Sequence, residues 1–282
     1  MKKGVAKRIL ALGFALVLAA GCLSGCGSAE GGDASAGAAS SDRLSDIIEK
    51  GKITIGVNPP GEPICFYDDE GNLIGYDVDW AYKLGETLGV DVELVEVNGE
   101  NRISMVSSGR VDVIFANITG NLERAKSINF SIPYLKTGVK MAVRPGLENV
   151  QVISDLNDPQ YKVALASGTT GEELVLEQAP EAEIIYVASL SDQCLALQEG
   201  RCDAILEDGT SLDYLASQSD YMEVRETSYT SDPICIGYAK GDPDFGRYLD
   251  MFVSYMISEG FQADTYYKWF GSEYASPMEH PW

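Results

Sequence analysis

SGRVDVI at residues 108–114 and EGRCDAI at residues 199–205 are two copies of one pattern, 91 residues apart. In each copy a glycine stands where a helix is expected to end, because glycine adopts positive φ without strain, and an apolar strand begins two residues later. A helix that leads directly into a buried strand is the repeating step of an α/β protein. The copies therefore predict two similar βα units, although chance similarity of two such units remains an alternative.

Strand and helix patterns alternate around both copies. Short apolar runs between turn residues predict strands, and apolar residues three and four apart predict helices of about ten residues. In the first series the predicted strands are 52–57, 91–95 and 111–116, and the predicted helices are 77–89 and 101–108. In the second series the strands are 162–166, 183–187 and 203–206, and the helices are 172–178 and 189–198. This alternation predicts an α/β fold with two open, mostly parallel sheets.

Polar residues follow the repeated strands at matching positions. At the same offset of 91, Asn117 stands opposite Asp208 and Thr119 stands opposite Thr210. Ligands of open α/β sheets bind outside the carboxyl ends of the strands. Two such sheets facing each other would therefore place Asn117, Thr119 and Asp208 in one cleft. For Asp208, capping of a following helix at residues 209–216 remains an alternative.

The turn Gly168-Thr169-Thr170-Gly171 lies between a predicted strand and a predicted helix. Backbone N–H groups and hydroxyls at a helix start can bind an anion. The alternative is purely structural, because residues 170–173 also match a capping box. The turn is not a nucleotide-binding P-loop, since no Gly-Lys-Ser/Thr follows it.

Charge and composition exclude several classes of function. The 282 residues include 43 acidic and 21 basic residues, a net charge of −22. Such a charge repels phosphate backbones, so a nucleic-acid partner is excluded. The one histidine, His280, stands three residues from the end of the sequence, which argues against Ser-His-Asp catalysis and histidine-rich metal sites. We therefore expect no metal, no cofactor and no enzymatic activity.

The first residues predict an export signal with a lipid attachment site. Four basic residues come before the apolar run Ile9–Ala20, which is shorter than the about 20 residues that span a membrane. Leu23-Ser24-Gly25-Cys26 then resembles a bacterial lipobox, in which the cysteine becomes the lipidated first residue. Residues 19–22 are a poorer second candidate, and an ordinary signal peptide remains an alternative. We predict a signal peptide at residues 1–25 and lipidation of Cys26.

Residues 26–42 are rich in glycine, alanine and serine, which predicts a flexible tether between the anchor and the body. The predicted location is therefore extracytoplasmic, with the protein anchored to the outer face of the cell membrane by lipidated Cys26.

Several separated stretches resemble the bacterial extracellular solute-binding proteins of family 3, the amino-acid receptors of ABC importers. The resemblance covers about residues 44–271. The stretches that carry it, in the family's order, are GKITIGV at 51–57, YDDEGNLIGYDVD at 67–79, GRVD at 109–112, ERAK at 123–126, FSIPY at 130–134, GTTG at 168–171 and KWFG at 268–271.

The resemblance implies a two-lobed, type II periplasmic-binding-protein fold in which two crossover strands join the lobes. Lobe 1 would comprise residues 43–135 and 234–282, and lobe 2 residues 138–230. The implied function is capture of a free amino acid by a monomer that delivers it to an ABC permease in the membrane. Two alternatives stay open: a receptor for a membrane signalling partner, and an enzyme similar to cyclohexadienyl dehydratases, for which Glu207 could supply an acid.

The family's ligand contacts match individual residues here. Arg124 matches the arginine that clamps the ligand α-carboxylate, a task that suits its planar fork of donors. Asp208 matches the carboxylate that pairs with the α-ammonium. The other matches are Thr119 as a hydroxyl donor, Asn117 through its backbone carbonyl, Gly168, Thr169 and Thr170 as the lobe 2 turn, and Asn58 as a polar contact from the first strand.

Two positions depart from the family pattern. Gly61 and Gly99 stand where the family often places the aromatic or large apolar residues that enclose the ligand side chain. We therefore expect an open side-chain pocket and a ligand bulkier than a small aliphatic amino acid. Asn58 and Glu62 are candidates for polar contacts, which favours a polar or basic side chain.

Four cysteines follow Cys26, at positions 65, 194, 202 and 235. An even number in an exported chain permits disulfides. Pairing 65 with 235 and 194 with 202 is the one arrangement that avoids tying the lobes together. Free, partly buried thiols are favoured because all four cysteines lie in apolar strand or helix patterns.

Overall fold

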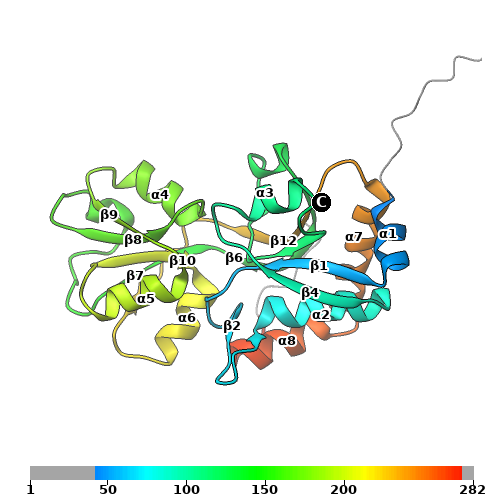
Figure 1. Cartoon of the computed structure of the whole chain (residues 1–282). Helices are drawn as coiled ribbons and strands as arrows, with labels where there is room; N and C mark the ends of the chain where they lie inside the picture. Colours follow the sequence, from blue (N-terminus) through cyan, green and yellow to red (C-terminus); the bar gives the residue numbers. More distant parts are fainter. Residues whose placement is uncertain (1–41, 275–282) are drawn as a thin grey trace, which may run out of the picture. The chain divides into compact units, whose positions relative to one another are not determined.

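The computed structural model describes residues 42–274. Its first sheet has the strand order β4-β1-β5-β12-β6. The bounds of these strands are β1 Lys52–Val57, β4 Asp91–Glu96, β5 Val113–Phe115, β6 Asn129–Thr137 and β12 Asp232–Tyr238. β1 runs parallel to β4 and β5, and β12 runs antiparallel to β5 and β6. Four of the five strands therefore point the same way (Figure 1).

The second sheet has the order β11-β7-β10-β8-β9. Its strands are β7 Val139–Val143, β8 Lys162–Ala166, β9 Glu183–Val187, β10 Ala204–Asp208 and β11 Glu223–Val224. β8 is parallel to β9 and β10, whereas β7 is antiparallel to β10 and β11. Here too one strand opposes the other four, so both sheets are mostly parallel in strand direction, as the alternation predicts.

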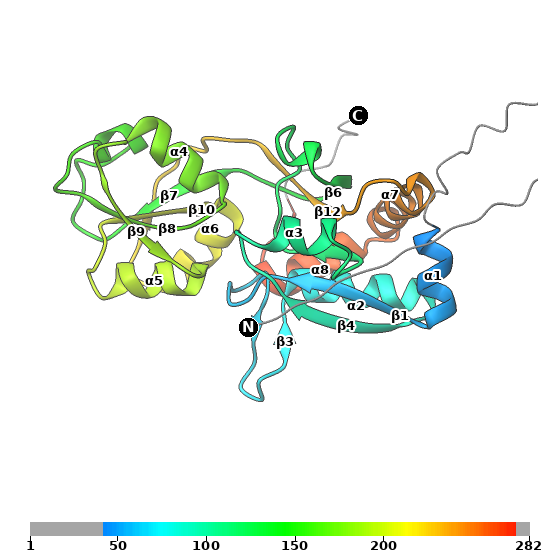
Figure 2. The same cartoon turned by 45° about the horizontal axis from the view of Figure 1, so that its top comes forward.

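Helices cover both faces of each sheet. We call the first sheet with α1 Arg43–Lys50, α2 Tyr76–Leu88, α3 Arg102–Ser107, α7 Pro243–Ser258 and α8 Phe261–Phe270 lobe 1. We call the second sheet with α4 Thr170–Gln178, α5 Leu190–Gln198 and α6 Gly209–Ser217 lobe 2. Short 3₁₀ turns at Arg124–Lys126 (η1) and Ile153–Leu156 (η2) and the hairpin of β2 Phe66–Tyr67 and β3 Leu73–Ile74 complete the chain. The hairpin extends away from the first sheet (Figure 2).

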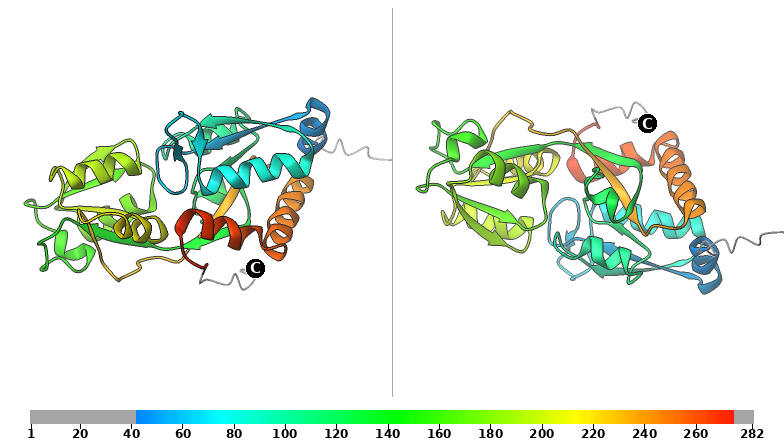
Figure 3. Two further views of the ribbon diagram at one scale, coloured as in Figure 1. Left: turned by 90° about the horizontal axis from the view of Figure 1, so that it is seen from below. Right: turned by 90° about the horizontal axis from the view of Figure 1, so that it is seen from above.

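The larger core of lobe 1 is aromatic. Trp80, Tyr76, Tyr134 and Phe115 are fully buried where α2, α7 and α8 pack on one face of the first sheet (Figure 3). The apolar face of α7 is part of this core, since its residues 245, 249, 252 and 256 are buried. A second cluster under α3 covers the opposite face. The aromatic side chains of α2, β5, β6 and α8 thus pack in the core of lobe 1.

Two chain segments cross between the lobes. β6 leads through Gly138 into β7, and Thr230 comes just before β12, whose Asp232 pairs with Thr137 of β6. The Val139 N–H donates to Thr230 Oγ1 over 2.8 Å. A Cβ on Gly138 would lie 2.3 Å from the Thr230 carbonyl oxygen, so only glycine lets the two segments lie this close. The two crossings agree with the implied fold, and the residue boundaries of the lobes remain a prediction.

The predicted signal peptide, Cys26 and most of the tether lie outside the described residues, as does His280. Among residues 42–274 no helix is long and apolar enough to cross a membrane. Cys65, Cys194, Cys202 and Cys235 are free and buried, the arrangement that their apolar surroundings favour.

Candidate functional site

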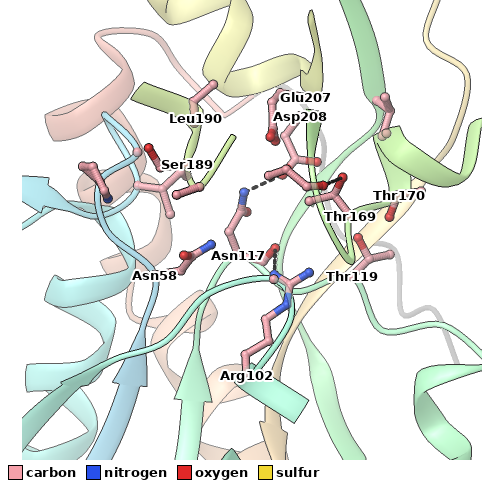
Figure 4. Close-up of a pocket in the computed structure, with 18 residues that line it drawn as sticks. Asn58, Arg102, Asn117, Thr119, Thr169, Thr170, Ser189, Leu190, Glu207 and Asp208 are labelled. Atoms are coloured by element: carbon pink, nitrogen blue, oxygen red, sulfur yellow. Dashed lines mark hydrogen bonds between the residues drawn. The ribbon is translucent and has the colours of Figure 1, made fainter. Parts of the chain in front are cut away.

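A cavity of about 70 Å³ lies between the lobes, at the carboxyl ends of β5 and β10. By the measure that a water needs about 10–15 Å³, it has room for a small molecule. Six of the eight predicted binding residues line it, namely Asn58, Asn117, Thr119, Thr169, Thr170 and Asp208. Figure 4 shows the side chains of both lobes converging on it. Asn117, Thr119 and Asp208, which were predicted to share one cleft from their places after strand ends, therefore do line one cavity.

Asn117 and Asp208, the pair related by the offset of 91, face each other directly. The Asn117 Nδ2 atom donates to Asp208 Oδ2 over 2.5 Å (Figure 4). Asn117 has a φ of 46°, a left-handed conformation that asparagine tolerates better than most residues. The other offset pair does not meet, because the Thr210 hydroxyl donates to Thr137 beside the crossing strands.

A buried carboxylate holds Asn117 in this conformation. Asp77 is fully buried, and it accepts the Asn117 N–H over 2.7 Å and the Tyr134 hydroxyl over 2.5 Å. Burial raises the pKa of Asp77 to about 6, and these two hydrogen bonds oppose that rise. Asp77 thus links the aromatic core of lobe 1 to the cleft.

Asp208 is the last residue of β10 and the residue before α6, but its side chain makes no capping hydrogen bond. The capping alternative is therefore wrong, and the carboxylate points across the cleft to Asn117. Burial, together with the neighbouring carboxylates of Glu207 and Asp232, raises the pKa of Asp208 to about 8. Asp208 therefore retains its proton near neutral pH unless a cation lies beside it.

Arg124 and Gly168 do not line the cavity. Arg124 is 7% exposed, and it donates through Nη1 to the Thr119 carbonyl and through Nη2 to the Gly168 carbonyl, each over 3.1 Å. The Asn121 side chain accepts the Arg124 N–H over 2.8 Å and so holds the η1 turn in place. Arg124 and Gly168 were both predicted to contact the ligand; in the structure they are hydrogen-bonded to each other, and their contact with a ligand stays a prediction.

The predicted capping box is displaced by one residue. Thr169, not Thr170, caps α4, because Thr169 Oγ1 accepts the Glu172 N–H over 3.2 Å. The same hydroxyl donates to the Ala166 carbonyl over 2.8 Å. Glu172 in turn accepts the Gly168 N–H over 2.8 Å, which fixes the turn from its other side. Thr170 is therefore the first helical residue and lines the cavity without a capping task.

Arg102 lines the cavity and was not among the predicted residues. It is 4% exposed and donates through Nη1 to the Ala116 carbonyl over 2.8 Å and to the Asn117 carbonyl over 3.3 Å. A signal for it exists in the sequence. Arg102 precedes the buried Val106 by four residues, and residues at that spacing lie on the same face of a helix.

Glu207 lines the cavity from lobe 2. Its Oε1 atom accepts the Gln193 side-chain amide over 2.5 Å, and burial raises its pKa. Lobe 1 thus contributes two cations near the cleft, Arg102 and Arg124, and lobe 2 contributes the two carboxyl groups of Glu207 and Asp208. None of the four forms an ion pair within the part of the chain that the structure describes.

The open pocket expected at Gly61 and Gly99 is wrong. A Cβ on Gly61 would lie 3.6 Å from Leu190 Cβ, so a lobe 2 side chain supplies the wall there. A Cβ on Gly99 would lie 2.2 Å from the Ser167 carbonyl oxygen, so the backbone of lobe 2 fills the space where a side chain at position 99 would lie. Glu62 does not line the cavity, because its Oε1 atom accepts the Tyr214 hydroxyl of lobe 2 over 2.8 Å.

Known proteins are similar to this chain in sequence and in fold. The L-cystine-binding protein TcyJ of Escherichia coli (strain K12) is 27% identical over 232 residues, which are 82% of this chain and 86% of TcyJ. The crystal structure of the ancestral amino acid-binding protein AncCDT-1, a precursor of cyclohexadienyl dehydratase, matches with a TM-score of 0.77 at 29% identity, covering 81% of this chain and 99% of that one. This likeness confirms the two-lobed, type II periplasmic-binding-protein fold.

An enzyme is also among the similar proteins. Cyclohexadienyl dehydratase of Pseudomonas aeruginosa is 24% identical over 256 residues, which are 86% of this chain and 90% of that enzyme. The family comparison is broader, since the model of the bacterial extracellular solute-binding proteins, family 3, matches residues 53–272. This match spans nearly all of both lobes, and the chain belongs to the bacterial extracellular solute-binding proteins of family 3.

Proposed function

We propose that this protein is the substrate-binding component of an ABC importer, which captures a free amino acid between its lobes and delivers it to a membrane permease. The observation that carries the proposal is the arrangement of buried ionisable groups, with Arg124 in lobe 1 and Asp208 in lobe 2. Buried charges need a partner of opposite sign. An α-amino acid carries both signs on neighbouring atoms, so it can bind to both residues at once.

The polar groups around the cavity fit the two ends of an amino acid. Arg124 and the hydroxyls of Thr119 and Thr170 donate to the α-carboxylate, as the family resemblance implies. Asp208 and the Asn117 carbonyl accept from the α-ammonium. Because an ammonium beside Asp208 favours its ionised form, binding makes the carboxyl group release its proton.

Further polar groups of the cavity favour a polar or basic side chain. Asn58 and Glu207 line the cavity, and both can accept hydrogen bonds. Leu190 and the backbone of Ser167 limit its width, which replaces the expectation of an open pocket. A side chain with N–H or O–H donors suits this lining better than a purely aliphatic one.

The test is a thermal-shift and calorimetry panel of the twenty standard L-amino acids and L-cystine, applied to a protein that begins at residue 27. At 100 times its Kd, a bound amino acid adds about 2.7 kcal/mol to the free energy of unfolding. We expect at least one such stabiliser, recovered chemically unchanged by mass spectrometry. A panel without any stabiliser would contradict the proposed function, and a dehydrated product from a cyclohexadienyl substrate would favour an enzyme instead.

The proposal includes the location. We propose that the protein acts as a monomer on the outer face of the membrane, attached by lipidated Cys26 through a tether of residues 26–42. Replacement of Cys26 by alanine should move the full-length protein from the membrane fraction to the soluble fraction or leave it unprocessed. Cys22→Ala is the matched control and should leave processing and membrane attachment unchanged. Normal processing and attachment of the Cys26→Ala variant would disprove the anchor.

A further inference from the structure

We propose that Arg102 is a second guanidinium of the carboxylate site, so that Arg102 and Arg124 together hold one carboxylate of the bound amino acid. The inference rests on the proposed function, because it states how the same cleft holds its ligand. It adds a binding residue that the family resemblance did not supply.

Both guanidinium groups point at one oxygen atom. Arg124 Nη2 donates to the Gly168 carbonyl over 3.1 Å, and Arg102 Nη2 donates to the same carbonyl over 3.4 Å. Two donors that share one acceptor lie close enough to share one carboxylate, which offers two oxygens and about four lone-pair positions. A carboxylate near the Gly168 carbonyl would therefore accept from both arginines.

Arg102 also retains donors without partners. Its Nε atom is buried and has no hydrogen-bond partner among the residues that the structure describes. Nη1 is engaged by the carbonyls of Ala116 and Asn117, and the Nη2 bond to Gly168 is long. A buried donor without a partner costs free energy, and a charge-assisted hydrogen bond to a carboxylate recovers it.

The charges around Arg102 point to the same ligand group. Neither arginine forms an ion pair within residues 42–274, and both are more than nine-tenths buried. Burial, together with the nearby positive charge of Arg124, lowers the pKa of Arg102 to about 10. One carboxylate placed between the two cations would relieve their mutual repulsion and supply the missing negative charge.

The test compares acids with their amides. For every amino acid of the panel that the wild type binds, calorimetry measures its affinity and, by competition at millimolar concentration, the affinity of its α-amide. We expect Arg102→Gln to lower the affinity for the amino acids by about 10- to 100-fold and the affinity for their α-amides by less than about threefold. The matched control is Arg110→Gln, which removes an exposed arginine just beyond α3 and should change neither affinity.

Each other outcome contradicts the proposal in its own way. An equal loss of affinity for the acids and for the α-amides would mean that Arg102 only positions the backbone, through its hydrogen bonds to the Ala116 and Asn117 carbonyls. A loss confined to glutamate and aspartate would mean that it binds a side-chain carboxylate. If Arg102→Gln does not fold, Arg102→Lys tests the same acid–amide difference with the positive charge retained. A wild type that binds nothing in the panel would refute the proposed function and this inference with it.

Discussion

Replacement of Asp208 by asparagine should nearly abolish amino-acid binding and, in the same protein, raise the stability measured without amino acid. The loss of binding follows because asparagine carries no charge for the α-ammonium. Removing one partner of a buried charge pair costs about 2–5 kcal/mol, which is about 30- to 4,000-fold in affinity. The asparagine side chain can still accept the Asn117 amide, so the contact between the lobes is retained.

The gain in stability follows from the raised pKa of Asp208, about 8 instead of the ordinary 3.8. Below pH 3.8 the carboxyl group is protonated in the folded and in the unfolded chain, and it has no effect. Between these two pKa values only the unfolded chain gives up its proton, so stability falls as the pH rises. At pH 7 the asparagine variant should be more stable by about 2–4 kcal/mol, and at pH 4 the difference should disappear.

Thermal unfolding at pH 4 and pH 7 together with calorimetry checks both effects. Because the wild type must lose the Asp208 proton on binding, its affinity should rise with pH by up to about tenfold per unit until about pH 8. Asp213→Asn is the matched control, since it removes an exposed carboxylate of α6 that pairs with Lys140 of β7. A variant that binds like the wild type, or whose stability gain persists at pH 4, would contradict the assigned role.

Replacement of Arg124 by alanine should reduce the affinity for every amino acid of the panel by about 30- to 4,000-fold. Arg124 is the buried guanidinium that the resemblance assigns to the α-carboxylate, and alanine leaves that carboxylate without its main counter-charge. Arg124→Lys should recover only part of the affinity, because a single ammonium cannot form two parallel hydrogen bonds. Calorimetry on both variants measures the loss.

Lys126 supplies the control for Arg124. It belongs to the same η1 turn, and its side chain is 70% exposed, so Lys126→Ala removes a positive charge without reaching the cleft. We expect the affinity of Lys126→Ala for each amino acid to lie within about twofold of the wild-type affinity. If Arg124→Ala also binds like the wild type, the carboxylate clamp is wrong, even though the fold and the family remain.

Much of the fold and of the cleft could be predicted from local patterns. The alternation of strands and helices predicted three strands of each sheet, namely β1, β4 and β5 and β8, β9 and β10, since each of them is specified by its own apolar run. The offset of 91 brought Asn117 and Asp208 together, because both follow strands whose carboxyl ends meet at one cleft. The remaining strands of the two sheets, β6, β7, β11 and β12, carry no such repeat, and pairings across about 100 residues depend on tertiary packing.

The features that the sequence did not predict depend on contacts between the lobes. Gly61 and Gly99 suggested missing walls, but Leu190 and Ser167 come from the other lobe and have no local signal. Glu62 was expected to contact the ligand, and its partner Tyr214 stands 152 residues away. Arg102 did have a local signal in its spacing from Val106, which shows that a charged residue on the buried face of a short helix merits attention.

The place of Asp208 in the chain has a mechanical consequence. The next residue, Gly209, donates its N–H to the Gly138 carbonyl over 2.8 Å, so the residue assigned to the ligand ammonium adjoins one of the two crossings. A rotation of lobe 2 about that crossing barely displaces Asp208, but its amplitude grows along the sheet towards β9, at the outer edge. In such a rotation the cleft residues move little and the far edge of the second sheet moves most. A spectroscopic label on β9 would therefore report ligand capture through the largest displacement.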